Sequence, residues 1–334
     1  MSDNEDLLRL ENVTKVFRRG IVFGQEIIAV NNISFKMSRE PEILTIAGES
    51  GCGKTTLAKI ILHIIEPTKG KIFINGQDMT EIKSGRDRVQ FTKMIQPIFQ
   101  NPYETFNPLK KIEIYLYDTA KLAKEDGNRS DIEKIIEDSL TAVGLSLQEI
   151  RDKYPHEFSG GQLQRLAIAR ALILNPNLLI ADEPVSMLDV SLRLSILNLF
   201  KELKNNKNLS IVYITHDLST AYYVGDRIAI MFRGSFVELG TTENVLNSPL
   251  HPYTQLLRSS ILKPTISKEE VLGTKLETTP AIDEETEFSE KGCKFSKRCP
   301  NVMDVCVKQE PPIFYVKDRE VKCWLYSNVT AKAV

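Results

Sequence analysis

The sequence predicts an α/β fold in which a parallel β-sheet forms the core, and two observations support this fold class. First, continuous apolar runs such as "EILTIA", "LLIA", "SIVYIT" and "RIAIMF" have the composition of buried strands. Second, segments with helical apolar spacing, among them "KTTLAKIILHII" and "GGQLQRLAIARALIL", alternate with these runs. Apolar strands that alternate with helices are typical of a parallel sheet covered on both faces.

The other elements follow in order along the chain. The segments "LLRLENVTKVF" and "IIAVNNISFKM" predict an N-terminal antiparallel β subdomain, and "GKIFINGQDMT" predicts a further strand that turns at Asn-Gly. Between about residues 100 and 175 the patterns are mostly helical, with Ser130 as the predicted N-cap of one helix. We therefore expect a helical subdomain in this range.

The C-terminal part differs in composition from the rest. Residues 267–290 include eight acidic residues and show little apolar periodicity, which is typical of a solvated linker. We therefore divide the 334-residue chain into a main domain at 1–260, an acidic linker at 261–292 and a small cysteine-rich domain at 293–334.

Bulk properties exclude several function classes. The formal net charge of -1 gives no general support for nucleic-acid binding. No apolar run reaches the roughly 18 residues that cross a bilayer. The start "MSDNEDLLRL" is acidic, whereas a signal peptide is basic and then apolar. We therefore expect a cytoplasmic chain that recognises its partners through local surfaces.

The stretch "GESGCGKTT" lies between a predicted strand and a predicted helix. It fits GxxxxGK[ST], the pattern of a phosphate-binding loop. The glycines allow backbone amides to turn toward phosphate oxygens, Lys54 would reach the β- and γ-phosphates, and the Thr55 hydroxyl would ligate Mg²⁺. Cys52 needs only to be small in this loop, and we assign it no redox or metal role.

The run "LLIADEP" places two carboxylates at the end of a predicted strand. A Mg²⁺-nucleotide site needs an acidic partner on a neighbouring strand, so we expect Asp182 to hold Mg²⁺ through water. Glu183, one residue further along, would polarise the attacking water as a general base.

The segment "YPHEFSGGQLQRLAIARAL" predicts a helix that begins near Ser159. The serine hydroxyl, the amides of Gly160 and Gly161 and the helix dipole would together favour an anion. A glycine lowers helix stability by about 1 kcal/mol relative to alanine. We therefore infer that anion binding, and not capping alone, accounts for the pair.

Over roughly residues 7–260 the sequence resembles the ATP-binding cassette (ABC) ATPase family. Walker A spans Gly48–Thr55, Walker B ends at Asp182, and the signature is "FSGGQ", in which Phe158 replaces the usual leucine. "IFQNPYETFNP" is similar to the Q-loop, "SMLD" to the D-loop and "YITHD" to the switch-histidine segment. The resemblance implies a P-loop NTPase fold with a helical signature subdomain.

The resemblance also implies a role for each matching residue. Glu183, His216 and Gln100 would be catalytic: Glu183 positions water, His216 contacts the γ-phosphate and Gln100 senses it. Thr55, Gln100 and Asp182 would ligate Mg²⁺. The residues implied to bind ATP are Phe17, Gly48, Ser50, Gly51, Cys52, Gly53, Lys54, Thr55, Thr56, Asp182, Ser159, Gly160, Gly161, Gln162 and Asp189.

The family's mechanism implies a dimer. ATP lies between Walker A of one subunit and the signature helix of another, so nucleotide joins two cassettes head to tail. One chain therefore carries two half-sites, and its partner would be a second ABC ATPase subunit, either a sister chain or a second copy. Phe17 lies where the family places an aromatic ring that stacks on adenine.

Three segments, "GESGCGKTT", "YPHEFSGGQLQR" and "HPYTQLL", resemble the ATPase subunits of oligopeptide and dipeptide importers, whose archaeal relatives include sugar importers. Such a subunit powers import through ATP-driven dimer closure at the cytoplasmic face of the membrane. Its partners would be two transmembrane permease subunits and, indirectly, an external solute-binding protein. Gln100 would be a hinge between the core and helical subdomains. Tyr103 and Phe106 would contact the permease, although packing within the helical subdomain explains both equally well.

Four of the five cysteines crowd the C-terminus at intervals of five, six and sixteen residues, namely Cys293, Cys299, Cys306 and Cys323. A reducing compartment disfavours disulfides, so the cluster suggests a metal site. Four thiolates suit either Zn²⁺ or an iron-sulfur cluster. The resemblance to importer subunits implies a [4Fe-4S] cluster, and the absence of the CxxC pairs that are usual in zinc sites favours it over Zn²⁺.

Two other function classes are weaker hypotheses. Soluble cassette ATPases that act on ribosomes or DNA usually carry two cassettes or a coiled-coil insertion, neither of which this sequence contains. A non-catalytic nucleotide-binding regulator usually lacks an equivalent of Glu183 or His216. The sequence leaves open whether a peptide or a sugar is transported and whether the tail is structural or redox-sensing.

Overall fold

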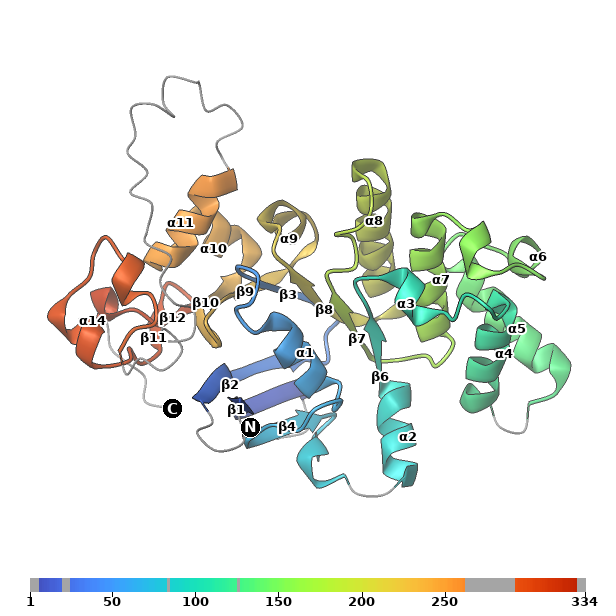
Figure 1. Cartoon of the computed structure of the whole chain (residues 1–334), viewed down its shortest axis with the longest axis horizontal. Coiled ribbons are helices and arrows are strands. Elements are labelled where there is room, and N and C mark those ends of the chain that lie inside the picture. The colour runs from blue at the N-terminus through green and yellow to red at the C-terminus, as the bar shows by residue number, and fades with distance from the viewer. Residues whose placement is uncertain (1–5, 20–24, 83–84, 125–126, 262–291, 329–334) are drawn as a thin grey trace.

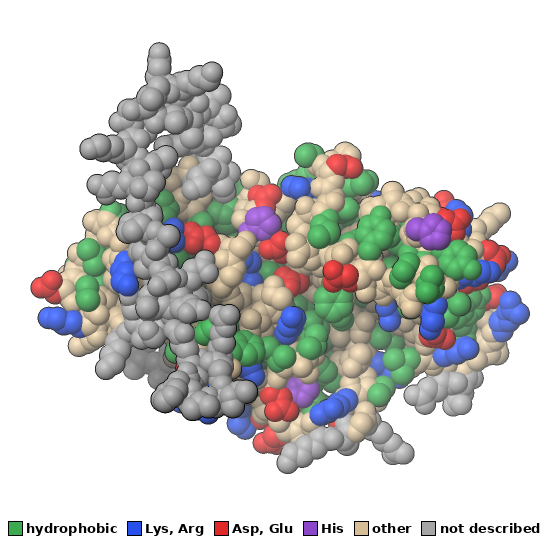
Figure 2. Space-filling model, in the orientation of Figure 1, with side chains coloured by type: hydrophobic (Ala, Val, Ile, Leu, Met, Phe, Trp, Pro, Cys, Tyr) green, Lys and Arg blue, Asp and Glu red, His purple; other side chains and the backbone are tan. Residues whose placement is uncertain are grey.

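The computed structural model of the chain describes residues 6–19, 25–82, 85–124, 127–261 and 292–328. Its strands form two sheets, and most of the strands lie near the centre of Figure 1. The helical part extends to the right in this view, and the C-terminal segment lies at the opposite end. Figure 2, in the same orientation, shows acidic and basic side chains interspersed on the face that is turned toward the viewer. Among the described residues, no helix is both long enough and apolar enough to span a bilayer.

The smaller sheet is the antiparallel one predicted at the N-terminus, with strand order β2-β1-β4-β5. Two residues, Asn75 and Gly76, form the predicted turn between β4 and β5, and their φ angles are 50° and 83°. Positive φ at both central residues matches the twist of a two-residue hairpin. The strands are β1 (Asp6–Arg19), β2 (Gln25–Ser38), β4 (Lys69–Ile74) and β5 (Gln77–Asp78).

The larger sheet contains the predicted parallel core, and its order is β11-β12-β10-β9-β3-β8-β7-β6. Neighbours from β9 to β6 pair in parallel, and β10 (Ser235–Thr241) runs antiparallel to β9. Every residue of β3 and β8 is buried, as expected for strands covered on both faces. The parallel strands are β9 (Arg227–Phe232), β3 (Ile43–Ala47), β8 (Ser210–Thr215), β7 (Leu178–Asp182) and β6 (Ile95–Ile98).

Alternate residues of the core strands face two different apolar layers. Ile211 and Tyr213 of β8 pack in the layer formed with the helices of the helical part and with α8. Val212 and Ile214 pack instead with α1 and the antiparallel sheet. The two-residue period of a strand thus joins both layers to one sheet. The helices of these two layers include α1 (Lys54–Ile61), α4 (Ile112–Ala123), α5 (Arg129–Thr141), α7 (Gly160–Leu172) and α8 (Val190–Lys207).

Further helices complete the structure, and one helix start corrects a prediction. Helix α5 begins after Asn128, whose side chain accepts a hydrogen bond from the Asp131 N–H at 2.9 Å. Ser130 therefore lies inside the first turn and is not the N-cap. The remaining α-helices are α2 (Gly85–Met94), α3 (Pro102–Thr105), α6 (Leu147–Ile150), α9 (Leu218–Val224), α10 (Thr242–Asn247), α11 (Pro252–Ile261) and α14 (Asp304–Lys308).

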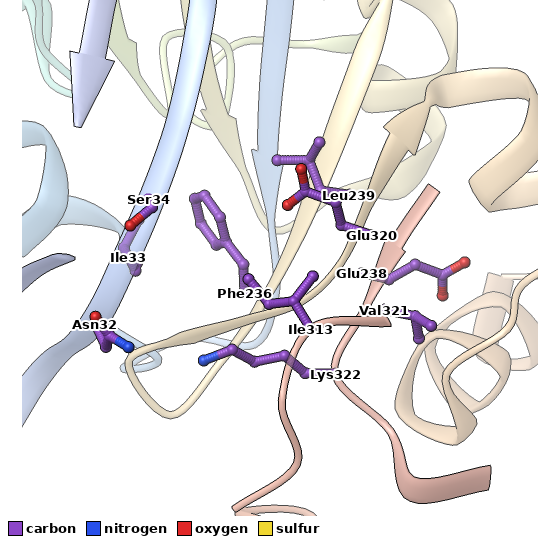
Figure 3. Close-up of a pocket in the computed structure, with 10 residues that line it drawn as sticks. All are labelled: Asn32, Ile33, Ser34, Phe236, Glu238, Leu239, Ile313, Glu320, Val321 and Lys322. Carbon is purple, nitrogen blue, oxygen red and sulfur yellow. The ribbon is translucent and has the colours of Figure 1, made fainter. Parts of the chain in front are cut away.

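The cysteine-rich tail is built onto the edge of the core sheet. Strand β12 (Arg319–Val321) pairs antiparallel with β10, and β11 (Phe314–Val316) pairs with β12. A buried ion pair between Arg319 and Glu238, with an N–O distance of 3.3 Å, joins the same two strands. Figure 3 shows a small pocket at this junction, lined by residues of β2, of β10 and of the tail. Almost all of the predicted linker at 261–292 lies outside the described residues.

Candidate functional site

The predicted phosphate loop connects β3 to α1, so the strand, loop and helix occur as expected. Gly53 caps the start of α1 in a left-handed conformation with φ of 108°. A Cβ atom at Gly53 would lie 2.1 Å from the Ala29 carbonyl oxygen. Both the backbone conformation and the available space therefore require glycine at this position.

Lys54 is buried at the first position of α1. Its Nζ donates to the carbonyl oxygens of Gly48 at 2.8 Å and Glu49 at 2.9 Å. These carbonyls hold the ammonium inside the loop, and charged phosphate oxygens would be stronger acceptors at the same place. The loop is therefore preformed around its own lysine.

Asp182 ends β7 beside the phosphate loop, and the Thr55 hydroxyl lies near its carboxylate. Its Oδ1 atom is buried and has no hydrogen-bond partner among the described residues. Burial raises the pKa of Asp182 above its usual value, and the nearby Thr55 hydroxyl opposes part of this rise. A buried carboxylate oxygen without a partner, next to a hydroxyl, is the oxygen donor set that Mg²⁺ prefers. The residues present thus fit the predicted Mg²⁺ site.

Glu183 makes contact with both other residues predicted to be catalytic. Its Oε1 lies 2.9 Å from Nδ1 of His216, and its Oε2 accepts a hydrogen bond from Nε2 of Gln100 at 3.4 Å. The backbone φ of Glu183 is 47°, an uncommon conformation for a non-glycine residue and one that is concentrated at functional sites. Residues from three strand ends thus meet beside the phosphate loop. The pocket at this place is lined by Ile27, Ala29, Ser50, Gly51, Gly53, Lys54, Thr55, Thr56, Gln100 and Glu183.

Phe17 lies at the edge of this pocket. It pairs with Ile27 across β1 and β2, and Ile27 is one of the pocket-lining residues. Directly opposed residues of an antiparallel pair share a face of the sheet, and the Phe17 ring is 41% exposed. An exposed aromatic ring next to the pocket wall suits stacking on a base.

The signature residues lie elsewhere. Ser159 is the N-cap of α7: its hydroxyl accepts from the Gln162 N–H at 3.2 Å, and Gln162 Oε1 accepts from the Ser159 N–H at 3.0 Å. Asp189 caps α8 in the same way through the Leu192 N–H at 2.9 Å. None of the signature residues lines the pocket around Lys54. Within one chain the predicted site is therefore split into two parts.

One signature glycine has a packing role that the sequence did not reveal. A Cβ atom on Gly161 would lie 2.9 Å from Cδ1 of Leu192 on α8, whereas the nearest atom to a Cβ on Gly160 would be 3.6 Å away. A larger residue at position 161 would therefore require the Leu192 side chain to shift, so packing of α7 on α8 favours Gly161, whereas a Cβ atom on Gly160 would make only an ordinary contact.

The chain is similar to known proteins along most of its length. The family described as "ABC transporter" matches residues 30–186, and the "Oligopeptide/dipeptide transporter, C-terminal region" matches residues 237–306. The oligopeptide transport ATP-binding protein AppF of Bacillus subtilis is 37% identical, over 98% of this chain and 99% of its own length. The dipeptide transport ATP-binding protein DppF of Haemophilus influenzae is 39% identical, over 93% and 94%. This chain belongs to the ABC transporter ATP-binding proteins.

A solved structure agrees with this assignment and with the predicted fold class. The ATP-binding cassette MJ0796, a dimer in a post-hydrolysis state bound to ADP and Pi, matches with a TM-score of 0.62 and 28% identity. The match covers 70% of this chain and 98% of that one. The protein is therefore an ATP-hydrolysing subunit of an ABC transporter. The similarity does not favour a soluble ABC ATPase that acts on ribosomes or DNA.

The four tail cysteines of this ABC ATPase are all free thiols. Among the described residues, which include these four, no group of three or more His, Cys, Asp or Glu side chains is arranged to hold a metal ion. The predicted metal site is therefore not supported in this arrangement. Two of the thiol residues are neighbours, since the Cys293 N–H donates to the Cys306 carbonyl oxygen at 2.7 Å, and burial raises the pKa of Cys323 to about 12.

The two aromatic residues predicted to contact the permease differ in exposure. Phe106 is 2% exposed and packs edge-on against Tyr115, with ring centroids 5.3 Å apart. It belongs to the apolar core of the helical part, so the packing explanation holds for this residue. Tyr103 is 51% exposed and Leu109 is 84% exposed, and both remain available at the surface.

Sequence reasoning missed a contact between the tail and the phosphate loop. Both terminal nitrogens of Arg298 bond the carboxylate of Glu49, at 2.9 and 3.0 Å. The spacing of the cysteines predicts a role for the thiols on either side of Arg298 but none for the arginine itself. The one available signal was an acidic residue inside the predicted phosphate loop, where a nearby cation would offset its repulsion of phosphate.

Proposed function

We propose that this ABC ATPase powers the import of di- and oligopeptides through ATP-driven closure of a dimer. The observation that carries the proposal is the meeting of Glu183, His216 and Gln100 beside the loop that holds Lys54. The names of the relatives supply the solute class, since AppF and DppF are oligopeptide and dipeptide transport proteins. The relatives give no support to the sugar-importer alternative.

In this proposal Glu183 is the general base. The His216 ring, 2.9 Å from its carboxylate, and the Gln100 amide hold the side chain in one orientation. A fixed carboxylate at the mouth of the pocket can accept the proton of a water molecule that attacks the γ-phosphate. Lys54 and the loop amides bind the phosphate oxygens, so Glu183 needs to act only on the water.

Thr55 and Asp182 would hold Mg²⁺, with Gln100 as a further ligand. The ion would supply charge neutralisation on the β- and γ-phosphate oxygens. The chain's own contribution is to keep the Asp182 Oδ1 atom buried and free of protein partners.

The split site supports a head-to-tail dimer as the working form. Ser159 and Gln162 are exposed at the start of α7, away from the pocket of their own chain. In the dimer we propose that this helix start, with Gly160 and Asp189 nearby, faces the triphosphate held by the other subunit. The second subunit is either a sister ATPase or another copy of this chain.

We further propose that the subunit works at the cytoplasmic face of the membrane, bound to two permease subunits that receive solute from an external binding protein. Tyr103 and Leu109 are exposed apolar side chains near Gln100 in the sequence, at the start of the helical part. Nucleotide-dependent movement of Gln100 would shift this surface as a rigid body.

For the tail we propose that Cys293, Cys299, Cys306 and Cys323 bind either a [4Fe-4S] cluster or Zn²⁺. Four free thiols in one small segment support this, although the side chains would have to turn toward a common point. Iron and zinc analysis after anaerobic purification, together with absorbance near about 400 nm for a cluster, distinguishes the two. Protein that holds neither metal would contradict the proposal.

The transport proposal is tested by uptake in the native host. Cells in which Glu183→Gln replaces the wild-type chain should lose uptake of a labelled di- or oligopeptide. Uptake of an unrelated amino acid serves as the control. Undiminished peptide uptake, or loss of sugar uptake alone, would overturn the assignment of the solute class.

A further inference from the structure

The tail contacts the phosphate loop through a two-point ion pair. Arg298 Nη1 donates to Glu49 Oε2 at 3.0 Å, and Nη2 donates to Oε1 at 2.9 Å. A guanidinium and a carboxylate that meet through two parallel hydrogen bonds are held in one relative orientation. Residues 249 positions apart in sequence are thereby fixed to each other.

Glu49 is bound on all of its polar groups. Its N–H donates to the Tyr253 hydroxyl at 3.1 Å, its carbonyl accepts from Lys54 Nζ at 2.9 Å, and its carboxylate binds Arg298. Lys54 is the residue proposed to bind the phosphates. Glu49 therefore contacts both that lysine, through its carbonyl group, and the tail, through its carboxylate.

The ion pair rests on an aromatic cluster that spans the main domain and the tail. Phe295 is 2% exposed, and its ring centroid lies 5.5 Å from both Phe232 and Tyr253. The Arg298 guanidinium lies over the Phe232 and Phe295 rings at 5.7 and 5.6 Å. The aromatic rings on one side and the hydrogen bonds to Glu49 on the other restrict the Arg298 side chain. The guanidinium is therefore held in one position.

The charge of Glu49 makes this contact matter for nucleotide binding. A phosphate loop gathers N–H groups and a lysine to attract an anion, and an uncompensated carboxylate in the same loop repels it. The Arg298 charge cancels that of Glu49 at hydrogen-bond distance. Toward a third charge such as a phosphate, an ion pair behaves as a weak dipole. Arg298 therefore removes most of the repulsion that Glu49 alone would exert on the nucleotide.

We propose that Arg298 is a positioning residue of the nucleotide site: its ion pair with Glu49 neutralises the acidic side chain of the phosphate loop and holds the loop in the shape that receives ATP. The proposal rests on the nucleotide site proposed above and adds the tail to it. The tail is then a structural part of the ATP site and not an appendage.

The test uses the purified full-length chain with Arg298→Ala. We expect the Kd and KM for ATP to rise about fivefold, the amount set by losing one partly exposed charged contact, while kcat changes less than twofold. Hydrogen exchange in the loop at residues 48–53 should become faster. Arg298→Lys keeps the charge but loses the two-point geometry, so its Kd for ATP should lie between those of the wild type and Arg298→Ala.

A double-substitution cycle separates neutralisation from a general loosening of the tail. Glu49→Gln alone should bind ATP at least as tightly as the wild type, because its amide oxygen still accepts a hydrogen bond from Arg298 and no charge remains to repel phosphate. Adding Arg298→Ala to it should change the Kd by less than twofold. Lys322→Ala is the matched control, because it removes an ion pair with Glu310 within the tail but makes no contact with the loop. It should leave the Kd for ATP unchanged.

Two results would overturn the proposal. One is an Arg298→Ala protein whose ATP affinity lies within twofold of the wild type. The other is an equal loss when Arg298→Ala is added to Glu49→Gln, since the arginine would then act without its partner. If the wild-type protein itself fails to bind ATP, the proposed nucleotide site is contradicted, and not only the proposed role of Arg298.

Discussion

The nucleotide site has two halves, the Walker A half around Lys54 and the signature half at the helix starts of Ser159 and Asp189. Contacts between distant segments join the Walker A half, whereas the capping contacts of the signature half lie within the first turn of each helix. In the first half, Glu183 bonds both His216 and Gln100, and these three residues lie at the carboxyl ends of parallel strands. In the second, Ser159 bonds Gln162 three residues away, and both of these residues are exposed.

This difference indicates how the work is divided within one chain. The Walker A half holds the groups that we propose to bind phosphate and to activate water, so the proposed chemistry depends on the tertiary fold. The signature half offers a capped helix start whose backbone amides are preformed. The proposed dimer thus needs only rigid docking of the second half onto the first.

The largest expected effect breaks the Walker A half alone. Glu183→Gln keeps the shape of the side chain and removes the base, so turnover should fall by about 10³-fold, which is within the usual range for general-base catalysis. The Kd for ATP should change little, because Lys54 and the loop remain. Phosphate release and nucleotide binding, measured on the same preparation, check both statements, and near-normal hydrolysis would remove Glu183 from its role.

A second substitution loosens the signature half and spares the first. Phe106→Ala removes a fully buried ring from the core of the helical part, so the free energy of unfolding should fall by about 3 kcal/mol. ATP affinity at Lys54 should be retained. Tyr103→Ala, three residues away but 51% exposed, is the control and should leave thermal stability unchanged. Equal destabilisation by both would show that the exposure of Tyr103 is misjudged.

The local parts of the site could be predicted from sequence and the distant contacts could not. Strand ends and loop patterns are short-range signals, so Lys54, Asp182 and Glu183 were placed correctly relative to the strands. Phe106 was left open between permease contact and internal packing, and Gly161 was assigned to anion binding, because a sequence does not show which neighbour covers a side chain. The structure buries the first and packs the second against Leu192.

The tail shows the same limit at larger scale. A change in composition predicted a separate small domain, yet β12 extends the core sheet through pairing with β10. Short strands of three residues carry almost no periodic signal. The pairing of Arg298 with Glu49 spans 249 positions, and nothing in either local segment identifies the other.

A third substitution separates capping from partner contact in the signature half. Ser159→Asp keeps a strong N-cap, since aspartate caps helices as well as serine does, and its charge suits the helix dipole. Thermal stability should therefore be retained. The added carboxylate would face the triphosphate of the other subunit, so ATP-dependent dimerisation in the Glu183→Gln background should weaken about tenfold. Unchanged dimerisation would mean that this helix start does not meet nucleotide.

The smallest expected effect concerns Asp182, where the needs of function oppose stability within the Walker A half. Because burial raises the pKa of Asp182, the folded state holds this proton at higher pH than the unfolded state does. The side chain therefore lowers the stability of the nucleotide-free protein above its folded pKa, and this loss is recovered as the pH falls toward the ordinary value of 3.8. Asp182→Asn should raise the free energy of unfolding by about 1 kcal/mol at pH 7, or about 2 °C in Tm.

The pH dependence distinguishes this explanation from a general packing effect of the substitution. The Tm difference between Asp182→Asn and the wild type should shrink as the pH is lowered, because the wild-type carboxyl becomes protonated and then resembles the amide. Mg²⁺ should strengthen ATP binding by the wild type and should no longer do so in the variant. A Tm difference that stays constant with pH would show that the ionised carboxylate is not the source of the instability, whereas the joint result would show that Asp182 is retained for Mg²⁺ despite its cost to the fold.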